Sequence, residues 1–294
     1  MAAAGDAGPA ECVINISEGR DRAVIGAVAV AAGDELLDVH SDPDHHRSVL
    51  TLAGPLAAVE AAARRVAVAA TATIDLDSHQ GVHPRLGAVD VVPFVPLEAA
   101  DGTPTPWNAL LAAREAYAAW SGGTLGVPCF LYGPERTLPD VRRGAFTTLA
   151  PDTGPPARHA TAGATAVGVR DALIAYNVWI APEAGIASGE VDVVAVARHL
   201  AKRLRRPGLR TLGLAVGADA QVSCNVVDPR SVTLVDVYDY VVEGAAAQGC
   251  VVSRGELVGL LPRSALSAVP EARWTQLGLR AEDAVESRLD TRRV

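Results

Sequence analysis

The chain has 294 residues, of which 49% are hydrophobic and 20% charged, a composition that excludes an intrinsically disordered protein. Its formal net charge of −8 argues against a nucleic-acid-binding protein, because contacts to phosphates need a basic surface. No uncharged apolar stretch reaches the length of a transmembrane helix, so we expect no membrane association.

The predicted elements begin after residues 1–10, which lack the basic start and apolar core of a signal peptide and are expected to form a disordered tail. Gly33 suits the end of the first helix, and Pro55 suits the first turn of the second. Strands are predicted over 12–16, 36–39, 48–53 and 89–95, and helices over 21–32 and 55–73. The order strand, helix, strand, strand, helix, strand is the ferredoxin-like pattern.

A middle section follows this pattern. A helix is predicted over 103–120 and a strand over 126–132. Residues 150–163 are rich in proline, glycine and small side chains, which predicts a long loop. A loop of this length inside a compact protein is usually either a functional element or a linker.

The second half repeats the order of the first. Strands are predicted over 171–180, 211–216, 221–227 and 249–253, and helices over 190–205 and 234–247. The sequence therefore predicts an α+β fold of two tandem ferredoxin-like (βαββαβ) subdomains, one over 11–170 and one over 171–294. Two such units in tandem favour a small-molecule cleft or tunnel between them.

The four cysteines are scattered, without a Cys-x-x-Cys spacing. Each lies in an apolar, strand-like segment, where a cysteine behaves as a small hydrophobic residue. We therefore expect neither a zinc site nor a disulfide framework, and this use of cysteine fits a cytoplasmic protein. These residues are Cys12, Cys129, Cys224 and Cys250.

Residues 78–87, Ser-His-Gln-Gly-Val-His-Pro-Arg-Leu-Gly, carry two histidines four positions apart. Pro84 directly follows His83 and disfavours a helical conformation there, so His83 is expected on a stiff loop before the buried strand. A histidine in this setting suits proton transfer near neutral pH. The alternative is that His83 caps or packs the turn.

A dense set of titratable residues surrounds this loop and the turn after the second strand. One interpretation is a metal centre, since histidine and aspartate are common ligands. Against it, Pro84 breaks the helix that a His-x-x-x-His metal motif needs. The other interpretation is metal-free acid–base chemistry by His83, with arginines binding an anionic substrate. The set is Asp38, Asp42, Asp44, His45, His46, Arg47, His79, His83 and Arg85, with Arg20 as a further arginine.

Several stretches together resemble the glutamate formiminotransferases, and they occur in that family's order from about residue 11 to residue 289. The strongest likeness is residues 74–96, which contain His83-Pro-Arg-Leu-Gly-Ala-Val-Asp-Val-Val-Pro-Phe-Val-Pro96. The other stretches are residues 11–20, 37–51, 220–225 and 255–262.

The resemblance implies transfer of a formimino group from N-formimino-L-glutamate to N5 of tetrahydrofolate, as in histidine degradation and one-carbon metabolism. It implies two α/β subdomains with a substrate tunnel, a homodimer and tetrahydrofolate as co-substrate. The resemblance also implies the stand-alone form, without a cyclodeaminase domain. From the residues themselves, with Pro84 against a metal motif, we expect no metal. The family's catalytic histidine falls on His83. Its folate-contacting loop falls on Gly154, Pro155, Pro156, Ala157, Arg158, His159, Ala160, Thr161, Ala162 and Gly163.

Further residues are candidates for positioning the substrates. Arginines suit the carboxylates that both substrates carry, and amides suit neutral hydrogen bonds to the pterin or the glutamate. For each polar residue the alternative is a purely structural role at a strand end. The candidates are Asn15, Asp38, Arg47, His79, Arg85, Asn177, Gln221 and Asn225.

Four positions depart from the family pattern. Gln80 and Val82 stand where the family has lysine and glutamate, and His46 replaces an asparagine. Ala162 stands where the loop commonly has a tryptophan. The alternatives to formimino transfer between these two substrates are therefore a folate-binding protein without transferase activity, or a related transferase with another donor or acceptor. A metal-dependent amidine hydrolase is the third.

Overall fold

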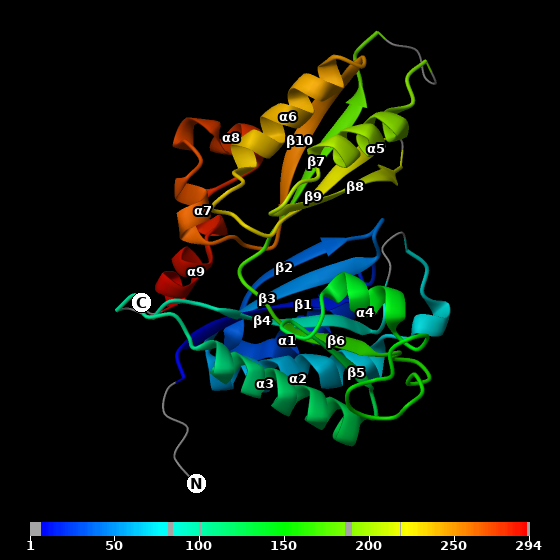
Figure 1. The fold of residues 1–294 in the computed structure, drawn as a ribbon, viewed down its shortest axis with the longest axis vertical. Helices are drawn as coiled ribbons and strands as arrows, with labels where there is room; N and C mark the ends of the chain where they lie inside the picture. Colours follow the sequence, from blue (N-terminus) through cyan, green and yellow to red (C-terminus); the bar gives the residue numbers. More distant parts are fainter. Residues whose placement is uncertain (1–6, 82–84, 100, 186–189, 218, 293–294) are drawn as a thin grey trace. The chain divides into compact units, whose positions relative to one another are not determined.

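The computed structural model describes residues 7–81, 85–99, 101–185, 190–217 and 219–292 (Figure 1). The chain divides into two compact units, Met1–Asp171 and Ala172–Val294. His83 and its neighbours at 82 and 84 lie outside the described residues. Residues 9 and 10 belong to the first strand and pair with its neighbours, so the tail expected over 1–10 is too long by these two residues.

The first unit is built on a six-stranded sheet of order β2-β3-β1-β4-β6-β5. The first four of these strands pair antiparallel in the ferredoxin-like order, and β6 and β5 extend the sheet by parallel pairing. Its elements are β1 (Pro9–Ile16), α1 (Arg22–Ala32), β2 (Leu36–Asp42), β3 (Arg47–Pro55), α2 (Leu56–Thr73), β4 (Val89–Pro96), α3 (Trp107–Trp120), β5 (Cys129–Tyr132), α4 (Leu138–Gly144) and β6 (Thr165–Val169).

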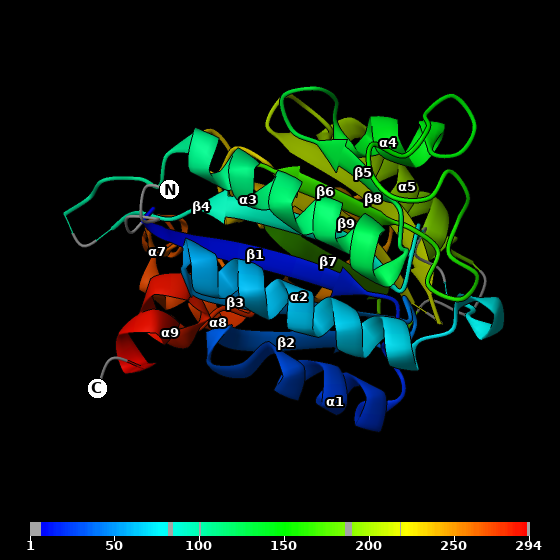
Figure 2. The same ribbon diagram turned by 90° about the horizontal axis from the view of Figure 1, so that it is seen from below.

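Helices α1, α2 and α3 cover one face of this sheet, and the main core lies between them and the strands (Figure 2). Helix α1 begins where the Asp21 side chain accepts hydrogen bonds from the first helical N–H groups, and it ends at Gly33, whose φ is 73°. Helix α4 packs on the opposite face over β5 and β6, with Phe130 and Val141 in a smaller core.

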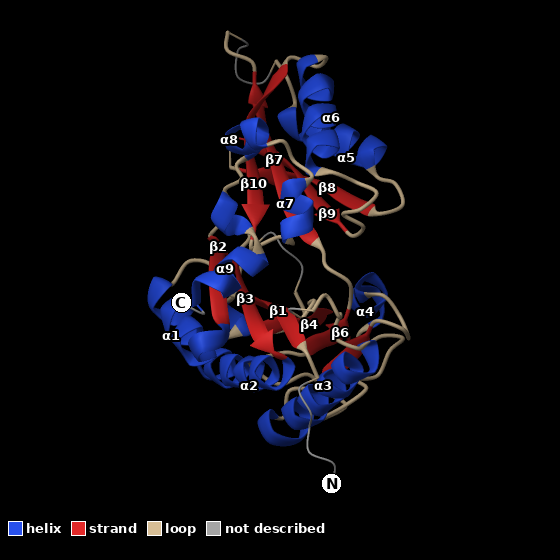
Figure 3. Cartoon of the chain, turned by 90° about the vertical axis from the view of Figure 1, so that its left-hand side faces the viewer, coloured by secondary structure: helices blue, strands red, loops and turns tan. Residues whose placement is uncertain are grey.

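The second unit is a four-stranded antiparallel sheet of order β10-β7-β9-β8, with α5 and α6 packed on one face (Figure 3). Its elements are β7 (Ile174–Pro182), α5 (Val193–Leu204), β8 (Leu209–Val216), β9 (Asp219–Val226), α6 (Leu234–Ala246) and β10 (Cys250–Val258), followed by α7 (Arg263–Ser267), α8 (Trp274–Leu277) and α9 (Val285–Arg292).

The ferredoxin-like pattern predicted for each half is confirmed, because both units contain the order βαββαβ with the expected neighbours. The sequence did not predict β6, α4 or the three helices after β10. The β6 residues are small and apolar and follow the long loop without a turn signal of their own. Helix α4 has a capping box between Thr137 and Asp140, a signal that was present in the sequence. The cleft or tunnel between the units stays a prediction.

Candidate functional site

The first unit contains a pocket of about 560 Å³ formed by two segments far apart in the sequence. One segment is the histidine loop with its approach, and the other is the end of the long loop before β6. Main-chain hydrogen bonds join them: the Leu76 N–H donates to the Thr161 oxygen over 2.9 Å, and the Ala164 N–H to the Leu86 oxygen over 3.0 Å. The lining residues are Leu76, Asp77, His79, Gly81, Arg85, Leu86, Arg158, His159, Ala160 and Gly163.

Two glycines allow these segments to meet. A Cβ atom at Gly87 would lie 2.1 Å from the Ala164 oxygen, and one at Gly163 would lie 2.3 Å from the Leu86 oxygen. Gly163 also has a φ of 68°, which L side chains rarely adopt. The expected folate loop and the expected catalytic loop are therefore in direct contact at the pocket.

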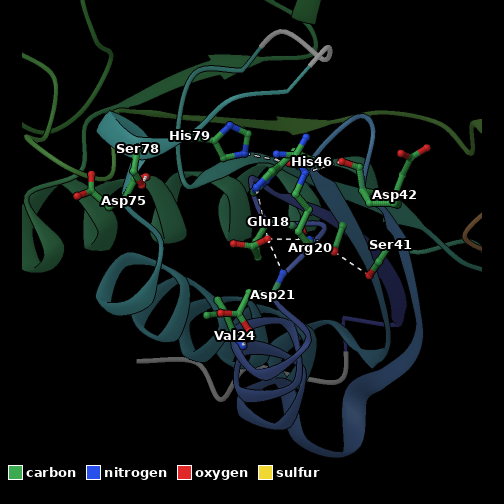
Figure 4. Close-up of polar contacts among 12 residues, drawn as sticks. Glu18, Arg20, Asp21, Val24, Ser41, Asp42, His46, Asp75, Ser78 and His79 are labelled. Atoms are coloured by element: carbon green, nitrogen blue, oxygen red, sulfur yellow. Dashed lines mark hydrogen bonds and ion pairs between the residues drawn. The ribbon is translucent and has the colours of Figure 1, made fainter. Parts of the chain in front are cut away.

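His79 lies where the histidine loop passes over the turn between β2 and β3 (Figure 4). Its Nε2 lies 3.0 Å from the main-chain oxygen of His46, and the two imidazole rings meet edge to face with centroids 4.0 Å apart. A carbonyl oxygen only accepts hydrogen bonds, so this shorter contact favours a proton on Nε2 over the 3.4 Å contact from Nη1 of Arg85, which would need Nε2 to accept. Gly81 permits this approach, because its Cβ would lie 2.7 Å from that of His46.

The turn that supports His79 is itself held by a network of hydrogen bonds around Glu18 (Figure 4). Glu18 Oε1 accepts from the N–H groups of Arg20 and Asp21 and lies 3.7 Å from Nε2 of His46. The Arg20 guanidinium donates to the Pro43 oxygen over 2.8 Å. His46 has a φ of 50°, an uncommon conformation for a residue other than glycine, and the network stabilises it.

A buried carboxylate lies beside the arginines of the site. Asp90 is 1% exposed and accepts from the Leu86 N–H and from Arg142, each over 2.6 Å. A register shift between β1 and β4 makes Asp90 the extra residue of a bulge. Burial lowers the pKa of Arg47 and Arg85, and the nearby Asp90 opposes both shifts. The sequence analysis missed Asp90, although a charged residue inside an apolar run was a visible signal.

The segment expected to contact folate is exposed from Gly154 to Arg158 and again at Ala160, and it becomes buried at Ala162 and Gly163. His159 and Gly163 exchange main-chain hydrogen bonds of 2.9 and 3.0 Å, and the Ala162 N–H donates to Nδ1 of His159. Ala162 is 1% exposed, so its side chain lies inside the protein rather than on the pocket surface.

Three of the predicted positioning residues of the first unit, Asn15, Asp38 and Arg47, do not line the pocket. Asn15 on β1 donates to the Val13 oxygen over 3.1 Å. Asp38 on β2 lies opposite Thr51 of β3 and is half-buried.

The second unit holds the remaining three predicted residues. Asn177 and Gln221 both donate to Oε2 of Glu256, over 3.1 and 3.4 Å, and the Trp179 indole N–H donates to the same oxygen over 2.8 Å. Asn225 is exposed on β9. The structure therefore brings two of the three together around a carboxylate that the sequence analysis missed. Only the register between β7 and β10 places Glu256 opposite Asn177.

Neither a metal-ligand cluster nor a membrane-spanning helix occurs within the described ranges. Among those residues, no group of three or more histidine, cysteine, aspartate or glutamate side chains is arranged to hold a metal ion. No helix within the same ranges is long and apolar enough to cross a membrane.

The fold and the site define an α+β protein of two ferredoxin-like units with a polar pocket in the first. Residues 9–170 match the family model described as the formiminotransferase domain, N-terminal subdomain. A glutamate formimidoyltransferase of Streptococcus pyogenes is 35% identical over 287 residues, which cover 89% of this chain and 91% of that protein. The chain therefore belongs to the formiminotransferase family.

Two other relatives show the range of lengths within this family. A glutamate formimidoyltransferase of Thermoplasma acidophilum is 33% identical and is matched over 89% of its length, with 87% of this chain covered. A formimidoyltransferase-cyclodeaminase of Gallus gallus is 34% identical, with 87% of this chain but only 50% of that protein covered.

Proposed function

We propose that this chain is a glutamate formimidoyltransferase, which transfers the formimino group of N-formimino-L-glutamate to N5 of tetrahydrofolate. The products are 5-formiminotetrahydrofolate and L-glutamate. The observation that carries the proposal is the match over about nine-tenths of both chains to a relative of that name. The pocket adds support, because it joins the two segments to which the family resemblance assigns catalysis and folate binding.

The chemistry needs one proton to move between two nitrogens. N5 of tetrahydrofolate attacks the formimino carbon, the C=N π electrons move to the imino nitrogen, and a tetrahedral adduct forms. N5 must lose its proton. The electrons on the imino nitrogen then re-form the C=N bond, and the glutamate nitrogen gains a proton as the bond from the formimino carbon to it breaks. A histidine near its ordinary pKa does both in sequence.

We assign this proton transfer to His83. The residue lies outside the described ranges, but the described residues on either side of it, Gly81 and Arg85, both line the pocket. Histidine as general acid and base typically contributes roughly a hundred- to ten-thousandfold in rate.

Arginines and neutral polar groups provide the binding interactions in this proposal. Arg47 and Arg85 bind substrate carboxylates, with His79 beside Arg85 and the segment 154–163 contacting folate. Asn15, Asp38, Asn177, Gln221 and Asn225 are proposed to orient the substrates. We further propose a cytoplasmic homodimer with subdomains over 11–170 and 171–294 and a substrate cleft or tunnel between them.

The test is an absorbance assay for 5-formiminotetrahydrofolate with the purified full chain and both substrates, with formiminoglutamate omitted as the control. Product that depends on formiminoglutamate supports the proposal. Binding of tetrahydrofolate without any product would instead indicate a folate-binding protein. Activity with another amidine donor, and none with formiminoglutamate, would indicate a related transferase.

A further inference from the structure

Phe146 has a backbone conformation that its side chain disfavours. It follows helix α4 and has a φ of 59°, in the left-handed region where bulky residues are outliers. The tight turn imposes this conformation: the Phe146 N–H donates to the Leu149 oxygen over 3.0 Å, and the Leu149 N–H donates to the Gly144 oxygen over 2.8 Å. Strain of this kind persists where the surrounding structure determines it, and it is concentrated at functional sites.

The strained turn fixes the position of an aromatic ring. The Phe146 ring meets the fully buried ring of Phe130 edge to face, with centroids 5.0 Å apart and an interplanar angle of 86°. The Phe146 ring is thus anchored to the smaller core beneath α4. The Arg158 guanidinium lies over this ring, with its central carbon 5.0 Å from the centroid.

Arg158 links this ring to the pocket. It lies in the segment expected to contact folate and is one of the pocket's lining residues. Within the described parts of the chain, its cation–π contact with Phe146 is its one interaction, and no carboxylate pairs with it. A guanidinium supported by a flat ring keeps its N–H donors available for a planar carboxylate.

We propose that Phe146 is a positioning residue that holds Arg158 at the pocket, where Arg158 binds a carboxylate of a glutamyl group. This inference rests on the proposed function, because tetrahydrofolate and formiminoglutamate each contain a glutamyl group. The place of Arg158 within residues 154–163 assigns the carboxylate to the tail of tetrahydrofolate rather than to the formimino donor.

The test compares dissociation constants for tetrahydrofolate and for tetrahydropteroate, which lacks the glutamyl tail. For Arg158→Gln we expect roughly tenfold weaker binding of tetrahydrofolate, the size of one charged hydrogen bond. For Phe146→Leu we expect roughly threefold weaker binding, because the guanidinium loses its support and must be ordered on binding. For tetrahydropteroate, the dissociation constant of every variant should lie within about twofold of that of the parent chain.

Three controls separate positioning from general damage. Phe146→Tyr keeps the aromatic face and should restore parental binding, whereas Arg143→Gln removes an exposed arginine of α4 and should change nothing. The double variant of Phe146→Leu and Arg158→Gln should bind no more weakly than Arg158→Gln alone, because both changes act through one contact.

Each result decides a different point. Equal weakening of tetrahydropteroate, or no change for Phe146→Leu, would overturn the positioning role. A raised KM for formiminoglutamate with unchanged folate binding would overturn the assignment to the folate tail and place the carboxylate on the donor. If the parent chain does not bind tetrahydrofolate at all, the proposed function itself fails.

Discussion

Nε2 of His79 lies 3.0 Å from the main-chain oxygen of His46, and this contact joins the histidine loop to the turn between β2 and β3. A hydrogen bond to this carbonyl needs a proton on Nε2. Nδ1 is buried and has no hydrogen-bond partner among the described residues. The same turn holds His46 in its left-handed conformation, so both sides of the contact are fixed by the fold.

The hydrogen bond from His79 to the His46 oxygen predicts that two substitutions of His79 differ in their effect on stability. A glutamine amide can still donate to the His46 oxygen, whereas alanine leaves that oxygen without its donor. We expect His79→Ala to lower the free energy of unfolding by about 1 kcal/mol and His79→Gln to lower it by less than half of that. Urea unfolding of the two variants measures the difference. Equal destabilisation by both variants would show that the hydrogen bond is not what holds the loop.

The contact between the two pocket segments predicts a strong effect at Gly163. Alanine there would place a Cβ 2.3 Å from the Leu86 oxygen at a φ of 68°. We expect Gly163→Ala to destabilise the protein by about 2 kcal/mol and to reduce substrate binding, because the pocket walls must separate. Gly26→Ala is the matched control, since nothing lies within 4 Å of its Cβ and α1 should gain up to about 1 kcal/mol. Thermal or urea unfolding compares them, and an unchanged Gly163→Ala variant would contradict the close approach.

Substitutions of Asp90 are expected to lower the free energy of unfolding by an amount that depends on which of its interactions is lost. Asp90→Ala removes the ion pair with the partly buried Arg142 and the acceptor of the Leu86 N–H. We expect a loss of about 3 kcal/mol in the free energy of unfolding. Asp90→Asn keeps an acceptor oxygen for the Leu86 N–H and should lower the free energy of unfolding by less than Asp90→Ala does. Denaturant titration of both variants checks the order, and a larger cost for asparagine than for alanine would contradict it.

Burial of Cys129 predicts a loss of stability at alkaline pH. Burial raises the pKa of its thiol from 9.0 to about 11, so the folded state keeps a proton that the unfolded state releases first. The stabilisation is fully present below pH 9 and is lost as the pH rises from about 9 to 11, by about 2 to 3 kcal/mol. Unfolding titrations between pH 8 and 11 measure this slope. Replacement by alanine should reduce the slope without abolishing it, because burial raises the pKa of the Cys12 and Cys224 thiols in the same direction. An identical slope in Cys129→Ala would exclude this thiol as a contributor.

The elements of the fold were predictable where hydrophobic periodicity is strong. Strand β4 and helix α2 follow directly from apolar runs bounded by glycine and proline. Strand β6 was missed because five small residues after a long loop carry little pattern of their own. Helix α4 was missed because seven residues are too few to show a clear helical period.

The site was predictable in its parts but not in its assembly. The loops around His79 and Arg158 were singled out by their histidines and by their length and composition, and the family resemblance assigned their functions. Their contact depends on the approach of Gly87 to Gly163, which are 76 positions apart in the sequence. Glu256 and Asp90 depend in the same way on strand register and on a bulge, neither of which local sequence encodes.

The most direct test of the central claim is formimino transfer by the His83→Ala variant, measured together with its binding of tetrahydrofolate. We predict that kcat falls by roughly a hundred- to ten-thousandfold while the dissociation constant for tetrahydrofolate changes little, because the imidazole moves a proton rather than holding the substrate. Turnover by His83→Ala within a few-fold of the parent chain would contradict the assignment of His83 as the acid and base of the transfer.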